Sequence, residues 1–293
     1  MDSFYHGYDT RHWNPLVGCD HGAEKGCLAH CWAAQCVAHW GDQWGIGSDF
    51  RPRLVRKWNE KPLHWRKPQI VAAGFMGDIA CLHGTEITAI VHIIRTTPQH
   101  TYLLLTKDPE RLAGKLAGPL PPNAWMGATV RNQEDADRVI PALLRIPAAH
   151  YWLSIEPLLG DMNLMNVEWG NGARMNVMEG CGSDPRAMTQ SLPNMFGPQL
   201  DWVVAGCESG HGARWGRLTM AERAHPGPST YHDVHGWLRS VRDQCAAAGV
   251  PFMTKQAPVW KGGKWAVSST LADFPPDLRI NQRPEGQKGE THV

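Results

Sequence analysis

Short apolar runs alternate with longer amphipathic segments along most of the chain. The runs are apolar nearly throughout, which is typical of strands buried on both faces of a parallel sheet. They are IVAAGF (70–75), TYLLLT (101–106), WMGATV (125–130), HYWLSIE (150–156), LDWVVAG (200–206) and VPFMTK (250–255). With a further strand leading into Cys19, the pattern predicts about seven strands.

Four other segments have helical periodicity and helix-terminus residues. They cover 85–97, 107–116, 132–146 and 232–249. Thr85 is the predicted N-cap of the first, and Asp108-Pro109 opens the second. Because the strands alternate with these helices, the sequence predicts parallel β/α units with both faces of the sheet covered.

Polar residues follow nearly every predicted strand. In a (β/α) barrel the carboxyl ends of the strands meet at one mouth, where active sites lie. We therefore expect an α/β fold with a partial or complete (β/α) barrel of about six to eight parallel strands, rather than an open doubly wound sheet. The residues at these strand ends are Asp78, Lys107, Arg131, Asn132, Glu156, Glu208, Ser209, Lys255 and Gln256. Any single one of them could instead be an ordinary polar loop residue.

The same pattern predicts one domain that covers residues 1–275. An insertion at 161–199, rich in Met, Asn and Gly, interrupts the β/α pattern, and a loop covers 211–230. Both are expected to lie over the barrel mouth, as lids and substrate loops do. The polar segment 276–293 is expected to be a disordered tail.

Composition adds limits but no function. The chain is 42% hydrophobic and 19% charged, and its net charge of +1 neither requires nor excludes a nucleic-acid partner. Its 14 Trp are expected mainly in the core, although Trp can also stack on planar ligands. No apolar run reaches the ~20 residues of a membrane span, and the first residues lack a signal-peptide core. We therefore expect a cytoplasmic protein whose eight Cys are thiols or metal ligands rather than disulfides.

Four of the Cys lie close together, at positions 19, 27, 31 and 36. Cys27 and Cys31 are four residues apart and are expected on one face of a starting helix, whereas Cys36 lies roughly 140° around that helix from Cys31. Three convergent thiolates suit an iron–sulfur cluster with one open iron position. The alternatives are a closed zinc site completed by His21 or His30, and structural thiols without a ligand.

This arrangement resembles the radical S-adenosylmethionine (SAM) superfamily, in which a three-cysteine loop follows the first strand of a β/α barrel. More closely, the chain resembles the phage- and prophage-associated three-cysteine family, over roughly residues 10 to 260. The segments that carry the resemblance are WNPLVGC (13–19), GCLAHCWA (26–33), TPQHTYLLLTKDPERL (97–112), WMGATVRNQEDADRVIPALL (125–144), SIEPLLG (154–160), DWVVAGCESGHGAR (201–214) and LRSVRDQCAAAGVPFMTKQ (238–256).

Two features depart from that family. Three residues separate Cys27 from Cys31, where the family has two, and His30 stands where its third cysteine would fall. One extra residue rotates a ligand by about 100° on a regular helix, so either the loop rearranges or His30 takes part. The second departure is Cys207, where the family has glycine.

The resemblance implies a [4Fe-4S] cluster held by Cys19, Cys27 and Cys31. Its open iron would bind SAM, and an electron donor such as flavodoxin or ferredoxin would reduce it. The resulting 5′-deoxyadenosyl radical would abstract hydrogen from a substrate at the barrel mouth. Phage association suggests a DNA base or a group attached to one, as in hypermodification or repair, in the host cytoplasm if the chain is phage-encoded. The alternatives are a small-molecule substrate, or a zinc-stabilised nucleic-acid-binding or interaction module without catalysis.

The resemblance also suggests roles for the strand-end residues. Gly77 and Asp78 lie where the superfamily has a turn for the SAM amino group. The further candidates for cofactor binding are Lys107, Thr129, Arg131, Asn132, Ser209 and Arg214. Arg214 and Lys255 could also hold a phosphate or carboxylate, or be solvated cations.

The candidates for catalysis are Glu156, Glu208, Cys207 and Lys255. The two carboxylates could act as acid and base or bind a cationic group, and the alternative is that they form salt bridges. Cys207 could return a hydrogen atom to a product radical. The alternative for Cys207, and for Cys81, is a buried and inert thiol.

Overall fold

The computed structural model describes residues 10–21, 31–170, 172–183, 195–207 and 230–284. Its centre is an eight-stranded sheet. In spatial order the strands are β1 (Thr10–Trp13), β4 (Ile70–Ala73), β5 (Thr101–Thr106), β6 (Ala124–Thr129), β7 (His150–Ile155), β12 (Trp202–Gly206), β13 (Phe252–Lys261) and β14 (Lys264–Ser268). All neighbours pair in parallel except β13 and β14, which are antiparallel.

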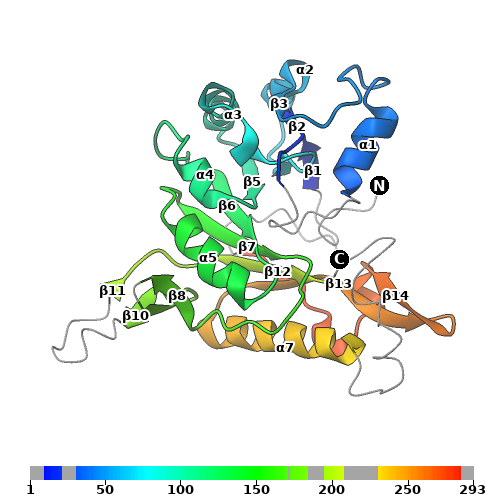
Figure 1. The fold of residues 1–293 in the computed structure, drawn as a ribbon, viewed down its shortest axis with the longest axis vertical. Helices are drawn as coiled ribbons and strands as arrows, with labels where there is room; N and C mark the ends of the chain where they lie inside the picture. Colours follow the sequence, from blue (N-terminus) through cyan, green and yellow to red (C-terminus); the bar gives the residue numbers. More distant parts are fainter. Residues whose placement is uncertain (1–9, 22–30, 171, 184–194, 208–229, 285–293) are drawn as a thin grey trace.

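The strand order follows the sequence order, so the chain progresses in one direction around the sheet. A doubly wound sheet would reverse its direction at a switch point, and this one does not. The sheet curls into a half-barrel whose edge strands are β1 and β14 (Figure 1). The prediction of a partial barrel built from β/α units is therefore confirmed at the level of the fold, and within the described residues the barrel is open.

Helices follow the parallel strands and cover the outer face of the sheet (Figure 1). They are α3 (Gly84–Thr96), α4 (Pro109–Ala113), α5 (Gln133–Leu144) and α7 (Thr230–Ala248). Asp108 caps α4 by accepting the backbone N–H of Arg111 at 3.3 Å, as its position before proline predicts. The predicted cap Thr85 is wrong, because His83 is the N-cap of α3, and its backbone N–H donates to the Glu86 carboxylate at 3.0 Å.

Smaller elements complete the first part of the chain. The strands β2 (Leu16–Val17) and β3 (Arg53–Leu54) form an antiparallel pair. In the sequence, α1 (Trp32–Trp40) lies between these two strands. After β3 come α2 (Arg56–Asn59) and the 3-10 turn η2 (Lys61–His64), which lead to β4, and η3 (Ile79–Cys81) follows β4.

The concave face of the half-barrel is filled by large apolar side chains. Trp125, Trp152 and Trp202 pack there with Leu103 and Met253. The indole of Trp152 donates a hydrogen bond to the carbonyl of Leu104 at 3.1 Å. On the neighbouring strand, a Cβ at Gly127 would lie 2.3 Å from the Trp152 ring, so glycine makes room for the indole. These Trp are core residues, which is the role expected for most Trp.

The insertion forms a second, four-stranded antiparallel sheet. Its strands are β8 (Val167–Gly170), β9 (Ala173–Asn176), β10 (Cys181–Ser183) and β11 (Met195–Phe196). The backbone N–H of Glu168 donates to Asp137 on α5, and that of Leu164 donates to Gln244 on α7. The predicted position over the mouth is therefore wrong for the described part of the insertion. The small sheet contacts α5 through β8 instead, beside the outer helices (Figure 1). Met175 and Met178 of the insertion are buried in the core that these helices share.

The last part of the chain also differs from expectation. The predicted strand 250–255 continues to Lys261 and turns back through Gly262 and Gly263, both at positive φ, to form a hairpin with β14. After η6 (Leu271–Asp273), η7 (Pro276–Leu278) buries Leu278 completely, and Asn281 pairs with Met253. This packing corrects the predicted tail boundary at 276, because 276–284 belong to the folded domain.

The loop predicted at 211–230 lies outside the described residues, except for the first residue of α7. Among the helices that the structure describes, none combines the length and the apolar character needed to cross a membrane.

Candidate functional site

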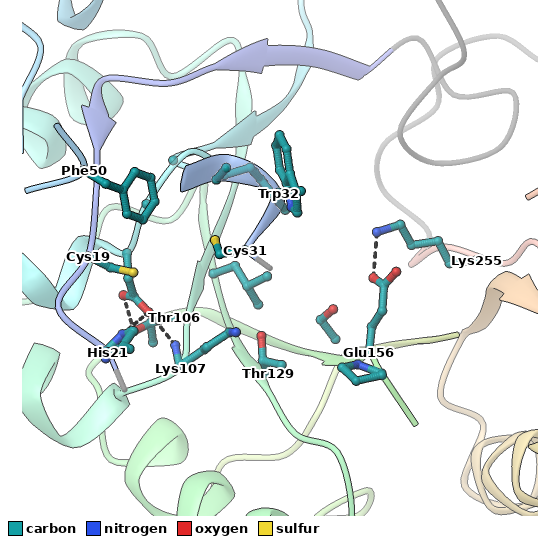
Figure 2. A pocket seen from close by; sticks show the side chains of 18 of the residues that line it. Cys19, His21, Cys31, Trp32, Phe50, Thr106, Lys107, Thr129, Glu156 and Lys255 are labelled. Carbon is teal, nitrogen blue, oxygen red and sulfur yellow. Dashed lines mark hydrogen bonds and ion pairs between the residues drawn. The ribbon is translucent and has the colours of Figure 1, made fainter. Parts of the chain in front are cut away.

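A cavity of about 530 Å³ opens at the carboxyl ends of the parallel strands. The residues at or just after the ends of β4, β5, β6 and β7 contribute to its wall. Lys255 and Gln256 contribute from the middle of β13, where its pairing with β12 ends, and the start of α1 closes one side. Figure 2 shows Cys19 and Cys31 in one part of this cavity and Glu156 and Lys255 in another. The strand-end rule therefore located the cavity correctly.

Two of the predicted cluster ligands lie in the cavity wall. Cys19 follows β2, and Cys31 is the N-cap of α1; both are partly exposed. Helix α1 begins only at Trp32, so the predicted placement of Cys31 on a helical face is wrong. Cys36 does not line the cavity and packs instead against the apolar cluster around Val37. Cys27 and His30 lie outside the described residues.

Tight backbone contacts position Cys19. Gly18 has φ +87°, and a Cβ there would lie 2.4 Å from the carbonyl oxygen of Arg51. Its backbone also pairs with the turn after β4, because Gly18 N–H donates to the Met76 carbonyl at 3.0 Å and Asp78 N–H donates to the Gly18 carbonyl at 3.3 Å. The segment around Cys19, here called the thiol loop, is thus joined directly to the turn at 76–78.

Asp78 is the centre of a buried hydrogen-bond network in the cavity wall. Its Oδ1 accepts from the Ala80 N–H at 2.9 Å and the Thr106 hydroxyl at 2.6 Å. Its Oδ2 accepts from His21 Nε2 at 2.8 Å and the Lys107 N–H at 2.7 Å. Protein donors therefore take all the acceptor positions that a carboxylate offers. This arrangement does not support the expected role of Asp78 as acceptor for the SAM amino group.

The same network determines the charge state of Asp78. Burial alone would raise the pKa of this carboxyl, but hydrogen bonds from His21, Thr106 and the Lys107 backbone hold it below its usual range. The ionised carboxylate joins η3, the end of β5 and the segment after Gly18. Its position indicates that it organises the floor of the site.

Gly77 has no room for a side chain. A Cβ there would lie 2.3 Å from the Gly18 carbonyl oxygen and 2.7 Å from the Leu16 side chain. We expect Gly77→Ala to lower the free energy of unfolding by about 2 kcal/mol, because backbone atoms would have to move apart. The measurement is chemical denaturation of the wild type and the variant.

Gly236 in α7 provides the matched control for that prediction. It has no atom within 4 Å of an added Cβ and no positive φ. Gly236→Ala should leave stability unchanged or raise it by about 0.5–1 kcal/mol, since alanine is the better helix former. Equal effects of the two substitutions would show that the crowding at Gly77 is not important.

A third group of side chains lies beside the thiol loop. Asp20, His21 and Cys81 place one potential ligand atom each within 4.8 Å of one another. Arg111 binds both carboxylate oxygens of Asp20, at 2.6 and 2.9 Å, and holds the pKa of this carboxyl well below its usual range. Burial raises the pKa of the Cys81 thiol. Asp20 is thus committed to an ion pair, and Cys81 is kept protonated in this arrangement.

Glu156 and Lys255 form the polar part of the wall that β7 and β13 contribute. Lys255 Nζ lies 2.6 Å from Glu156 Oε2, and Gln256 Nε2 donates to Glu156 Oε1 at 2.6 Å. Gln256 also donates to the carbonyl of Cys207. Glu156 therefore forms a salt bridge, which was the alternative to a catalytic role for this residue. Cys207 itself is fully buried in the core and does not line the cavity, which argues against its expected role as a hydrogen-atom donor.

The other predicted site residues divide into three groups. Lys107 and Thr129 line the cavity. Arg131 and Asn132 do not line it: Arg131 binds Asp135, and Asn132 caps α5 by accepting the Asp135 N–H at 3.0 Å. The remaining candidates, Glu208, Ser209 and Arg214, lie outside the described residues.

The site lies within a domain that comparison assigns to a family. The chain belongs to the family described as Protein of unknown function (DUF5131). The profile of that family matches residues 7–290, so it covers every element described above. Neither a curated protein nor a solved structure matches the chain.

Several lining residues of this DUF5131 domain were not among the sequence-based candidates. Ser154, Thr106 and the aromatic residues Trp32, Phe50 and Phe75 all contribute to the wall. Register could have indicated Ser154, because it pairs with Thr129 on the neighbouring strand and so lies on the same face. Trp32 and Phe50 come from the start of α1 and a loop, where periodicity carries no information. Phe75 was predicted inside the strand 70–75, but β4 ends at Ala73 and Phe75 lies in the turn after it.

Proposed function

We propose that this DUF5131 protein is a radical SAM iron–sulfur enzyme, which cleaves SAM reductively and abstracts a hydrogen atom from a substrate at the mouth of the half-barrel. The observation that carries the proposal is the placement of the thiols. Cys19 and Cys31 line one cavity at the carboxyl ends of parallel strands, whereas Cys36 does not line it. For the three of these cysteines that the structure describes, this division supports Cys19 and Cys31 as ligands and Cys36 as a bystander.

The donor set is chemically suitable for the cluster. Thiolates are the ligands that iron–sulfur clusters use, and Cys27 would supply the third. When bound, such a cluster supplies the electron that splits the sulfonium bond of SAM. A cavity of about 530 Å³ is also within the size range of small-molecule and cofactor sites.

The chain's own residues would then bind and orient the ligands. Lys107 places a cation next to the Asp78 network, where it can neutralise a carboxylate. Thr129 and Ser154 offer hydroxyl groups on neighbouring strands. Phe50 and Phe75 give the same cavity apolar walls that reduce its water content.

The Glu156–Lys255 pair gives the cavity a second polar region, outside the thiol loop. Because its two charges neutralise each other, it can bind a polar substrate group without favouring either sign. We propose a DNA base, or a group attached to one, as the substrate, with a small molecule as the alternative. A flavodoxin- or ferredoxin-like donor would deliver the electron.

The proposal is tested by anaerobic purification. We expect brown protein with broad visible absorbance that releases 5′-deoxyadenosine when it is reduced with dithionite in the presence of SAM. The measurements are iron and sulfide analysis, absorbance spectra and chromatographic detection of the nucleoside. Colourless protein with one equivalent of zinc, and no SAM cleavage after reconstitution with iron and sulfide, would refute the proposal.

One observation favours a zinc-stabilised module as the second candidate. The ligand atoms of Asp20, His21 and Cys81 are within 4.8 Å of one another, and these residue types bind zinc. The bidentate ion pair of Asp20 with Arg111 competes with that use, and a neutral Cys81 thiol is a poor ligand. We therefore rank this candidate below the enzyme.

A further inference from the structure

We propose that the segment 51–67, here called the basic segment, is a docking surface that holds a nucleic-acid strand beside the cavity. The segment reads RPRLVRKWNEKPLHWRK and contains seven Lys and Arg but one acid, Glu60. Its net charge is therefore +6. Since the whole chain carries +1, the rest of the chain carries −5. A nearly neutral protein thus concentrates its positive charge in one short stretch.

Most of these cations are not neutralised by acids. Arg53 is the exception, because its guanidinium binds the Asp49 carboxylate at 2.5 Å. The other six cations have no acidic partner among the residues that the structure describes, and all six are exposed: Arg51, Arg56, Lys57, Lys61, Arg66 and Lys67. Unpaired, solvent-exposed Lys and Arg are the groups that release counterions when they bind phosphates.

Aromatic rings lie among these cations. Lys57 and Lys61 place their ammonium groups 5.5 and 5.4 Å from the centroid of the Trp58 ring. Trp44 packs edge-on against the same ring and is 36% exposed. Proteins that bind single-stranded nucleic acid commonly combine cations with aromatic rings, since the phosphates pair with the cations and the bases stack on the rings.

The basic segment begins at the rim of the cavity. Phe50, directly before it, lines the cavity, and the carbonyl of Arg51 packs against Gly18 next to Cys19. In Figure 1, β3 and α2, which form part of the segment, lie beside β2. Trp32, which is 56% exposed, also belongs to the cavity wall. A strand bound to the segment would therefore place a base near the mouth.

The composition of the surface favours nucleic acid over a lipid surface. Membrane-binding segments combine cations with a continuous apolar face. Within the basic segment, Leu63 is the one large apolar side chain that is strongly exposed. Four of the seven cations are Arg, whose planar guanidinium matches phosphate geometry.

The test is binding of a fluorescently labelled 20-nucleotide single strand of mixed sequence to the full-length protein as purified, followed by anisotropy at several salt concentrations. We expect the double variant Arg56→Glu/Arg66→Glu to bind at least about tenfold more weakly at 50 mM salt. The slope of log affinity against log salt should fall by about 1.4, or about 0.7 for each lost phosphate contact on a single strand.

The matched control is Arg145→Glu/Lys261→Glu, which changes the net charge equally at exposed positions outside the segment. It should bind like the wild type. Equal weakening by both variants, or no binding by the wild type, would overturn the proposal. A second outcome would also overturn it: the wild type binds phosphatidylserine vesicles but not the oligonucleotide, and Arg56→Glu/Arg66→Glu no longer binds the vesicles. A colourless protein that binds DNA through Arg56 and Arg66 would refute the proposed enzyme and leave this inference standing.

Discussion

Replacing Cys31 by serine should remove the visible absorbance of the anaerobically purified protein and slow SAM cleavage by more than about 100-fold, because loss of a ligand exceeds the 10–100-fold effect of an outer contact. Cys31 lines the cavity together with Cys19, and a serine hydroxyl is a poor substitute for a thiolate. The measurements are iron content, absorbance and 5′-deoxyadenosine released per enzyme.

Cys36→Ser is the matched control for this experiment. Both residues are partly exposed, five positions apart and packed against the same apolar cluster, but only Cys31 of the two lines the cavity. The control variant should keep its iron and its activity, with at most a modest loss of stability. If Cys36→Ser loses the cluster and Cys31→Ser retains it, the assignment of ligand and bystander is wrong.

Replacing Asp78 by asparagine should lower the free energy of unfolding by about 3 kcal/mol, because the amide would place an N–H₂ group against buried donors. Asp78 is 4% exposed and accepts four hydrogen bonds from three parts of the chain. Urea denaturation of the two proteins at pH 7 measures the difference. Asp20→Asn is the control, since its carboxylate is half exposed and its pair with Arg111 should contribute no more than about 1 kcal/mol.

The effect of Asp78 should also depend on pH in a defined direction. The folded-state pKa of this carboxyl is lowered, so the folded protein favours the ionised form more than the unfolded chain does. Its contribution is therefore fully present above the unfolded value of ~3.9 and is lost as the pH falls through the lower folded value. The stability difference between wild type and Asp78→Asn should shrink in that acid window. A difference that grows on acidification would contradict the assigned charge state.

Sequence patterning predicted the strands well because burial on both faces leaves a clear signal. The predicted run 101–106 coincides with β5, and the run 125–130 differs from β6 by one residue at each end. The same patterning could not place the insertion, because Met-rich, glycine-containing segments carry no information about which outer surface they cover. The Gly262-Gly263 dipeptide is typical of a hairpin turn, but the sequence-based prediction did not include the hairpin of β13 and β14.

The site was predictable in its location but only partly in its chemistry. A residue type at a strand end indicates the mouth, yet it does not reveal its partner. Arg131 and Asn132 end a strand and serve the following helix, and Asp78 uses its carboxylate for internal donors. Contacts such as that between His21 and Asp78 join positions 57 residues apart, and local periodicity cannot detect them.

The tryptophan layer inside the half-barrel determines how molecules reach the cavity. Side chains two positions apart on a strand share a face, so Leu105 and Ser154 line the cavity directly above Leu103 and Trp152. Leu103 is 2% exposed and Trp152 is fully buried, so this layer seals the described sheet below the cavity. Within the described residues, substrate and product therefore cannot pass through the floor of the cavity, and both must enter and leave on the side away from the tryptophan layer.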